Sequence, residues 1–262
     1  MWTDYNAAYR DALSDGTFLA WREAGARQKA INIVEVCQKI PISSALEIGC
    51  GTGSVLRALG SLQFANRYVA TDISAAAVEF AKHSCGPLLN EAYVGSADSL
   101  PFPDKSFSVA ILSHVIEHLE NPICAVRDAA RVADYVVIEV QTERVLSNTI
   151  RAQILGKPFL SAAEAGHVQF WSSRSITSFL EQDCGQEILS RHRDLLSREV
   201  EFHGRKSARK IKPLIKEALK SVIPDWLYAQ LLTTHATFLC REFTRGEKKL
   251  GVAPNSSGKE AH

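Results

Sequence analysis

Short apolar runs alternate with amphipathic stretches along most of the chain. The runs that predict buried strands span residues 45–48, 67–71, 91–95, 107–112, 135–140, 187–189 and 235–240. Nearly continuous apolar segments of this length are typical of strands that are covered on both faces. Because these strands alternate with helical segments, the pattern predicts an α/β fold with a doubly wound, Rossmann-like parallel sheet.

Three glycines follow the first predicted strand at alternate positions, in the order Gly49, Gly51 and Gly53. Glycine allows positive φ and lets a ligand approach the main chain closely. A dinucleotide fingerprint would place glycine or alanine where this chain has Ser54, and the carboxylate of Glu47 would repel a pyrophosphate. A carboxylate suits an ammonium or a sulfonium group instead, so the turn indicates S-adenosylmethionine.

Two aspartates follow later strands at the spacing that such a ligand requires. Asp72 ends the second strand about 20 residues after the glycines, where a carboxylate can accept hydrogen bonds from both ribose hydroxyls. Asp98 follows the third strand and is placed to accept a hydrogen bond from the adenine amino group. Either residue alone would be ordinary in a turn.

Together these motifs resemble the class I S-adenosylmethionine-dependent methyltransferases, specifically the type-11 group. The segments that carry the resemblance are Leu46–Gly53 (LEIGCGTG), Ala70–Ser74 (ATDIS), Ser96–Pro122 and Gly166–Ile176 (GHVQFWSSRSI). The resemblance implies a seven-stranded sheet whose last strand is antiparallel. It also implies that the cofactor contacts Glu47, Gly49, Cys50, Gly51, Asp72, Ile73, Ala97, Asp98, Ser99 and Ser113.

The same resemblance suggests a domain organisation. Residues 1–44, whose pattern is helical with a break at Ser14-Asp15-Gly16, would cover the cofactor site. Residues 45–245 would form the methyltransferase domain, with helical cap insertions at about 141–170 and 203–232. The polar residues 246–262 predict a disordered tail. Asn121-Pro122 predicts a helix start, with a capping residue before proline.

The chemistry of methyl transfer requires a group that takes a proton from the nucleophile, and histidine is suited to this near neutral pH. His114 and His118 follow the fourth strand, where the family places residues near the transferred methyl. If this segment turns helically, His114, Glu117 and His118 share a face. His114 is the first candidate for the base and His118 the second.

The same segment also predicts a divalent metal site. It resembles the Glu-x-x-Glu-His motif of ubiquinone-biosynthesis O-methyltransferases and small-RNA 3′-terminal methyltransferases, with histidine in place of the first glutamate. The implied ligands are His114, Glu117, His118 and His167. Three imidazoles and a carboxylate would suit zinc, manganese, iron or cobalt more than magnesium. The alternative is that the Glu-His pair only fixes the loop.

Composition sets limits on location and partners. The 262 residues are 46% hydrophobic, with a net charge of +1 and no CxxC pair among the six cysteines. No apolar stretch of about 18 residues could span a bilayer, and we expect a cytoplasmic protein. Residues 205–223 predict a basic amphipathic helix, which binds nucleic acid in some proteins, but near neutrality of the whole chain favours simple packing.

The sequence therefore predicts a methyltransferase that acts on an oxygen nucleophile of a small molecule, such as a sugar, a quinone precursor or a natural-product intermediate. Two alternatives are methylation of an RNA 3′-terminal ribose and a non-catalytic domain that binds S-adenosylmethionine as a partner protein. The identity of the acceptor and the oligomeric state are not determined by these patterns.

Overall fold

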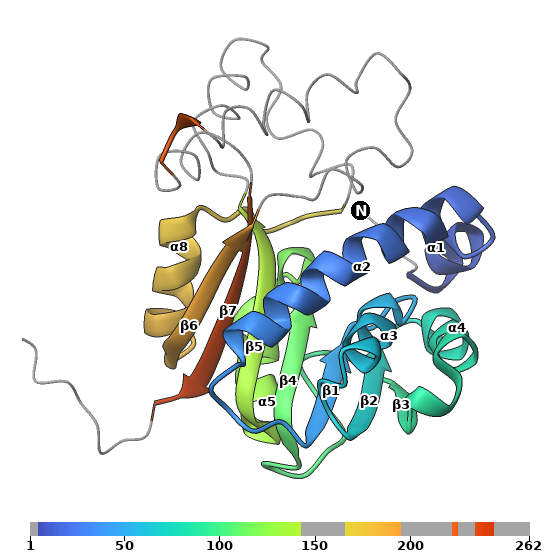
Figure 1. Cartoon of the computed structure of the whole chain (residues 1–262), viewed down its shortest axis with the longest axis horizontal. Helices are drawn as coiled ribbons and strands as arrows, with labels where there is room; N and C mark the ends of the chain where they lie inside the picture. The colour runs from blue at the N-terminus through green and yellow to red at the C-terminus, as the bar shows by residue number, and fades with distance from the viewer. Residues whose placement is uncertain (1–4, 143–165, 195–221, 225–233, 244–262) are drawn as a thin grey trace, which may run out of the picture.

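The computed structural model of the chain describes residues 5–142, 166–194, 222–224 and 234–243 (Figure 1). The expected tail at 246–262 lies outside these ranges. So do most of the two expected cap insertions and the basic segment, apart from Val222 and Ile223.

The described residues form one seven-stranded sheet with the strand order β3-β2-β1-β4-β5-β7-β6. The strands are β1 (Ser44–Ile48), β2 (Arg67–Asp72), β3 (Glu91–Val94), β4 (Phe107–Ser113), β5 (Ala133–Thr142), β6 (Gln186–Asp194) and β7 (Thr234–Glu242). β7 runs antiparallel to both of its neighbours, β5 and β6, while β1 to β5 pair in parallel. The predicted fold class, including the antiparallel last strand, is confirmed.

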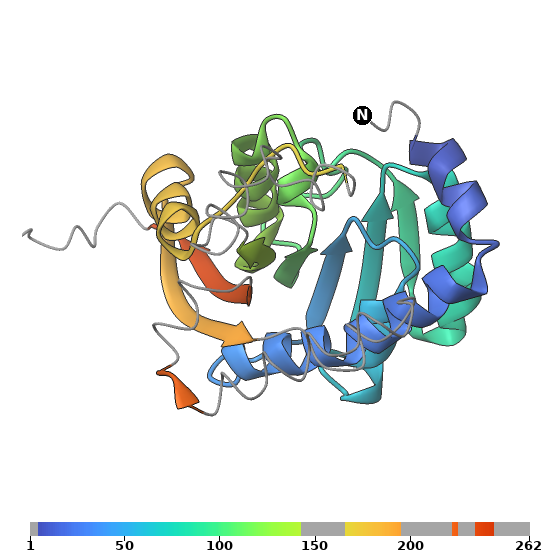
Figure 2. The ribbon, with the colours of Figure 1, turned by 90° about the horizontal axis from the view of Figure 1, so that it is seen from above.

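The helices cover both faces of this sheet, as Figures 1 and 2 show. They are α1 (Tyr5–Ala12), α2 (Gly16–Val36), α3 (Ser54–Ser61), α4 (Ala75–Cys85), α5 (Pro122–Val132) and α8 (Ser173–Ser178), with short turns at Gly86–Leu88, Ile116–His118 and Phe179–Asp183. The predicted break between the first two helices is present. The side chain of Asp15 accepts a hydrogen bond from the N–H of Thr17 and begins α2 there.

Two apolar clusters lie on the two faces of the sheet, because successive side chains of a strand point to opposite sides. One cluster joins Leu112 and Ile138 to α5 and α8. The other joins Ile111 and Val137 to α2, α3 and α4. The sheet is therefore the middle of three layers, and α2 crosses it on the face that will carry the site.

Two local expectations differ from the structure. Asn121 precedes α5, but its side chain does not cap the helix; its amide donates to Cys124 Sγ instead. The predicted strand at 187–189 is longer, extending from Gln186 to Asp194 because it pairs along β7. Polar and charged residues in that strand hid its length, since β6 is the sheet edge and tolerates them.

Candidate functional site

The carboxyl end of the sheet carries a row of polar side chains on the face that α2 covers. Ser113 of β4 lies opposite Glu139 of β5, and Glu139 lies opposite Thr237 of β7. Paired residues of neighbouring strands point to the same face, and Glu47 of β1 and His235 of β7 share that face by the two-residue period of a strand. The interior is thus apolar at one end of the strands and ionisable at the other.

The glycine turn after β1 is held by the end of β2. The N–H groups of Gly49 and Cys50 donate to the carbonyl of Thr71 at 2.8 and 3.0 Å. The N–H of Gly51 donates to Asp72 Oδ2 at 2.8 Å, and the N–H of Ser74 donates to Asp72 Oδ1 at 2.9 Å. Burial raises the pKa of Asp72, and these two hydrogen bonds oppose that rise by stabilising the carboxylate.

Gly51 is where the turn requires glycine most clearly. Its φ is +53°, and a Cβ there would lie 2.8 Å from the hydroxyl oxygen of Tyr9 and 3.0 Å from Arg22 Nη2. The N-terminal helices therefore reach the turn directly, through one residue of α1 and one of α2. Burial raises the pKa of Tyr9 to about 12, so its hydroxyl stays protonated.

Glu47 is the polar group in this region with the clearest need for a ligand. It is 2% exposed, and its Oε2 has no hydrogen-bond partner among the residues that the structure describes. Burial raises its pKa to about 8, although the positive charges of Arg22 and Lys29 oppose the rise. A buried carboxylate without a full set of partners is costly, and a cationic ligand would relieve that cost.

The expected adenine side is more open. Ile73 follows β2 and is 56% exposed, which is high for a large apolar side chain. Asp98 and Ser99 are also exposed, whereas Ala97 is half-buried. Cys50 differs from these residues because its side chain is buried in the apolar cluster beneath α2, so only its backbone faces the turn.

His114 stands at the end of β4 with a positive φ of 57°. Its Nδ1 lies 2.8 Å from Glu117 Oε1, and its Nε2 lies 3.2 Å from His235 Nδ1. Burial lowers the pKa of His114 well below its ordinary value, and the nearby Lys29 lowers it further. Nε2 is therefore within hydrogen-bond distance of His235, whereas Nδ1 has only a close polar contact, because Glu117 Oε1 has no aligned hydrogen-bond partner among the described residues.

His118 is oriented differently, because Ile116–His118 is a 3₁₀ turn and not the start of an α-helix. Its Nδ1 lies 3.2 Å from the carbonyl oxygen of Gly166, and its ring packs edge-on against His167 at a centroid distance of 4.8 Å. Burial lowers the pKa of His118, with Glu117 opposing the fall. The turn that carries His118 is joined to the segment that carries His167 by hydrogen bonds from the N–H groups of Val168 and Gln169 to the Glu117 carbonyl.

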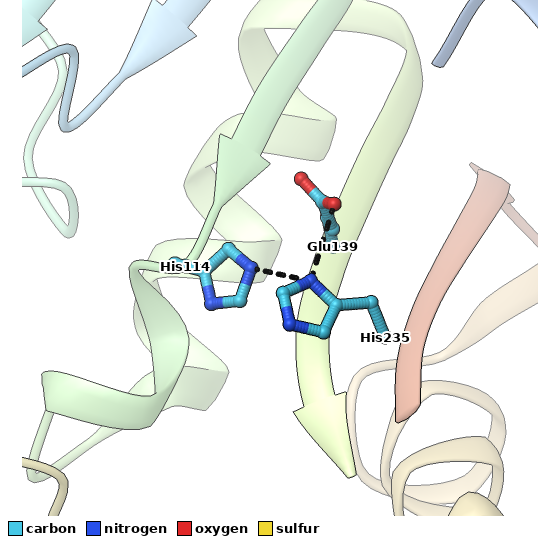
Figure 3. A group of neighbouring side chains, drawn as sticks. All are labelled: His114, Glu139 and His235. Carbon is cyan, nitrogen blue, oxygen red and sulfur yellow. Dashed lines mark hydrogen bonds and ion pairs between the residues drawn. The ribbon is translucent and has the colours of Figure 1, made fainter. Parts of the chain in front are cut away.

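The four expected metal ligands are thus split between two contacts. His114 meets Glu117, while His118 meets His167. Within the described ranges, the side chains whose ligand atoms all lie within 4.8 Å of one another are instead His114, Glu139 and His235 (Figure 3). Glu139 and His235 were absent from the sequence-based site.

Four polar residues of this face escaped the sequence analysis: Arg22 and Lys29 of α2, Glu139 of β5 and His235 of β7. Lys29 Nζ lies 3.4 Å from Ser113 Oγ, and Ser113 Oγ donates to Glu139 Oε2 at 2.6 Å. One signal was present, because Glu139 is a charged residue inside an apolar strand. Arg22, Lys29 and His235 gave no such signal, because the residues that they meet in the folded chain are far away in sequence.

None of the helices within the described residues is both long enough and apolar enough to cross a membrane. All six cysteines lie in those residues and are free thiols.

Part of the chain matches a known protein family. Residues 46–134 match the family described as a methyltransferase domain. An uncharacterized 37.1 kDa protein in transposon TN4556 of Streptomyces fradiae is 29% identical over 130 residues, which are 49% of this chain. The chain spans only 37% of the length of that relative.

Several solved structures share the fold. A geranyl diphosphate methyltransferase in complex with S-adenosylmethionine is 12% identical, with a TM-score of 0.58 over 83% of this chain and 85% of that one. The Bacillus halodurans C-125 protein BH2331, described as a methyltransferase, is 16% identical, with a TM-score of 0.54 over 83% of this chain and 99% of that one. The [4+2]-cyclase SpnF is 18% identical, with a TM-score of 0.56 over 82% of this chain and 81% of that one. At these identities the likeness shows the fold alone.

Proposed function

We propose that the chain, whose residues 46–134 match a methyltransferase domain, is a class I S-adenosylmethionine-dependent methyltransferase of the type-11 group that transfers a methyl group to an oxygen nucleophile of a small molecule. The observation that carries this proposal is the pairing of Glu47, a buried carboxylate with an unpartnered oxygen in the described structure, with the glycine turn that Asp72 holds. When bound, S-adenosylmethionine supplies an activated methyl on a cationic sulfur.

The cofactor assignments follow from this geometry. Glu47 would hold the cationic group of the amino acid end, since a buried carboxylate favours a cationic group, and Gly49 and Gly51 would let that end approach the main chain. Asp72 would accept hydrogen bonds from the ribose. Ile73 and Ala97 would cover the adenine ring, and Asp98 and Ser99 would bind its polar edge. Cys50 would contribute its backbone, and Ser113 would line the methyl end.

For the proton on the acceptor oxygen, the geometry supports His118 over His114. If the Gly166 carbonyl accepts from His118 Nδ1–H, Nε2 carries the lone pair and can act as a base. No described residue is hydrogen bonded to that Nε2. His114 instead has Nε2 within hydrogen-bond distance of His235 and Nδ1 in close polar contact with Glu117. We therefore assign His118 as the base and His114 as part of the surrounding polar cluster.

Cys124 is an exposed free thiol, which supports a reducing compartment because such thiols persist there. We accordingly propose the cytoplasm as the site of the reaction.

A direct test measures S-adenosylhomocysteine formation across a panel of hydroxyl- and carboxyl-bearing acceptors, including sugars and dihydroxybenzoates. We expect turnover with at least one class, and a fall in kcat of about 10²-fold or more in His118→Gln with unchanged cofactor affinity. His192→Gln is the matched control, since His192 lies on β6 and pairs with Glu35.

Two outcomes would replace the proposal. Tight binding of S-adenosylmethionine without turnover on any acceptor would indicate a non-catalytic binding domain. Methylation of RNA termini, with binding that weakens steeply with salt, would indicate the RNA enzyme class.

A further inference from the structure

The cluster of His114, Glu139 and His235 is placed by the sheet itself. His114 directly follows β4, Glu139 lies in β5, and His235 is the second residue of β7, and these are three adjacent strands of the sheet. Because β7 is antiparallel, its beginning meets the carboxyl ends of the other two. Figure 3 shows the three side chains turned toward one another.

The distances match those between ligands of one small cation. His114 Nε2 and His235 Nδ1 are 3.2 Å apart, and His235 Nδ1 and Glu139 Oε1 are 3.8 Å apart. A tetrahedral zinc ion with bonds of about 2.0–2.1 Å separates its ligand atoms by about 3.3–3.4 Å. All three ligand atoms lie within 4.8 Å of one another, so side-chain movements would close the set around an ion.

A proton cannot satisfy the same three atoms. If His235 Nδ1 is protonated, it donates to His114 Nε2, and Glu139 Oε1 at 3.8 Å remains beyond hydrogen-bond distance. Glu139 is 0% exposed, and its Oε1 has no hydrogen-bond partner within the described part of the chain. A buried oxygen aimed at two imidazole nitrogens without a bond is costly unless a cation lies between them.

The surrounding contacts orient each side chain for this role. Metal-bound histidines usually direct their second ring nitrogen to a carboxylate or carbonyl. The Nδ1 of His114 lies 2.8 Å from Glu117 Oε1, which is close enough for a polar contact although the two groups are not aligned as a hydrogen bond in the described structure. The second oxygen of Glu139 is fixed by a hydrogen bond from the hydroxyl of Ser113 at 2.6 Å.

We propose that His114 Nε2, His235 Nδ1 and Glu139 Oε1 bind one divalent transition-metal ion, with zinc as the best match for two imidazoles and one carboxylate. Glu117 is then a positioning residue and not a ligand. This site differs from the one that the sequence predicts, because it replaces Glu117, His118 and His167 with Glu139 and His235.

The nearest fixed positive charge is compatible with this arrangement. Lys29 approaches from the Ser113 side, at 3.4 Å from Ser113 Oγ, and Ser113 in turn contacts Glu139 Oε2. The ion would be bound by the other oxygen of Glu139. Lys29 therefore approaches the Glu139 carboxylate only through the Ser113 hydroxyl, on the side of the oxygen that the ion would not use.

Three protein ligands leave a fourth position for water or for an acceptor oxygen. An ion there would hold a substrate hydroxyl and lower its pKa. This part rests on the proposed function. Metal binding itself does not, so it can be measured on the apo chain without any acceptor.

The test titrates untagged, chelator-treated full-length chain with Zn²⁺ in a calorimeter. We expect one ion per chain, with affinity lowered by at least tenfold in Glu139→Gln and in His235→Gln. Glu117→Gln should lower it by about 10–100-fold. His118→Gln and His192→Gln should retain the affinity of the unaltered chain, and circular dichroism verifies that each variant is folded.

A crystal of the unaltered chain soaked in Co²⁺ decides the matter even if a variant fails to fold. The proposal predicts an anomalous peak at about 2.0–2.2 Å from the three ligand atoms. A peak between Glu117, His118 and His167 would overturn it in favour of the sequence-based site. The absence of any ordered ion, or Zn²⁺ affinity unaffected by both Glu139→Gln and His235→Gln, would also overturn it.

Discussion

Asp72 Oδ2 accepts a hydrogen bond of 2.8 Å from the N–H of Gly51, so the end of β2 fixes the glycine turn that follows β1. The two residues are 21 positions apart in sequence. The same carboxylate is proposed to bind the ribose. The Asp72 carboxylate would therefore both hold the turn in its conformation and bind the ligand.

Asp72→Ala should weaken binding of S-adenosylhomocysteine by about 10–100-fold, because hydrogen bonds to a charged group contribute about 1.5–3 kcal/mol. Calorimetry measures this directly. Glu91→Ala is the control, since Glu91 is an exposed carboxylate of neighbouring β3 that pairs with Arg67. Equal affinities for Asp72→Ala and the unaltered chain would refute the ribose assignment.

Gly51→Ala should abolish measurable cofactor binding and destabilise the fold. The added Cβ meets Tyr9 and Arg22 and adopts a positive φ. Gly185→Ala is a matched control, because Gly185 also has a positive φ of 70° but no atom lies within 4 Å of the added Cβ. Both changes should cost about 1–2 kcal/mol of backbone strain. Only Gly51→Ala should lose binding, as thermal shifts with and without cofactor would show.

Glu47 links cofactor binding to proton release. Its pKa of about 8 keeps it mostly protonated at pH 7 in the free protein. A cationic ligand favours the ionised form, so binding should release up to about one proton per chain at that pH. Calorimetry in buffers of different ionisation enthalpy counts the protons. Glu47→Gln should release fewer, and identical release by the two proteins would contradict the assignment.

The same raised pKa affects stability in the absence of ligand. Folding favours protonated Glu47, so this contribution is complete below pH 4.5 and is lost as the pH rises toward about 8. The free energy of unfolding should fall by a few kcal/mol over that interval, at about 1.4 kcal/mol per pKa unit. Urea unfolding at pH 5 and pH 8 should show a smaller fall in Glu47→Gln. An equal fall in both would disprove the role of Glu47.

Phe238 joins the antiparallel strand to the core. It is 1% exposed in β7 and lies opposite Ile138 of β5. Phe238→Ala should lower the free energy of unfolding by about 3–5 kcal/mol because it leaves a cavity. Phe243, which follows β7 and is 48% exposed, supplies the control. Phe243→Ala should change stability by less than about 1 kcal/mol in urea titrations.

The sheet and the glycine turn could be predicted from local patterns. Apolar runs such as 107–112 and 135–140 report burial on both faces, and the glycines report a turn that side chains would obstruct. The length of β6 was missed, because an edge strand carries polar residues that hide its extent. The helical turn that would have placed His114, Glu117 and His118 on one face does not form, since the left-handed backbone of His114 ends β4 and is followed only by a 3₁₀ turn.

The sequence by itself determined the order of strands and helices and the acidic residues at two strand ends, because these depend on residues close together in the chain. Only the tertiary structure decided which ionisable groups meet. His114 and His235 are 121 residues apart in sequence, and they are in contact because β7 inserts antiparallel beside β5. Lys29 contacts Ser113 because α2 crosses the face of the sheet on which Ser113 lies. Pairings of this kind depend on long-range packing, which no local pattern of residues encodes.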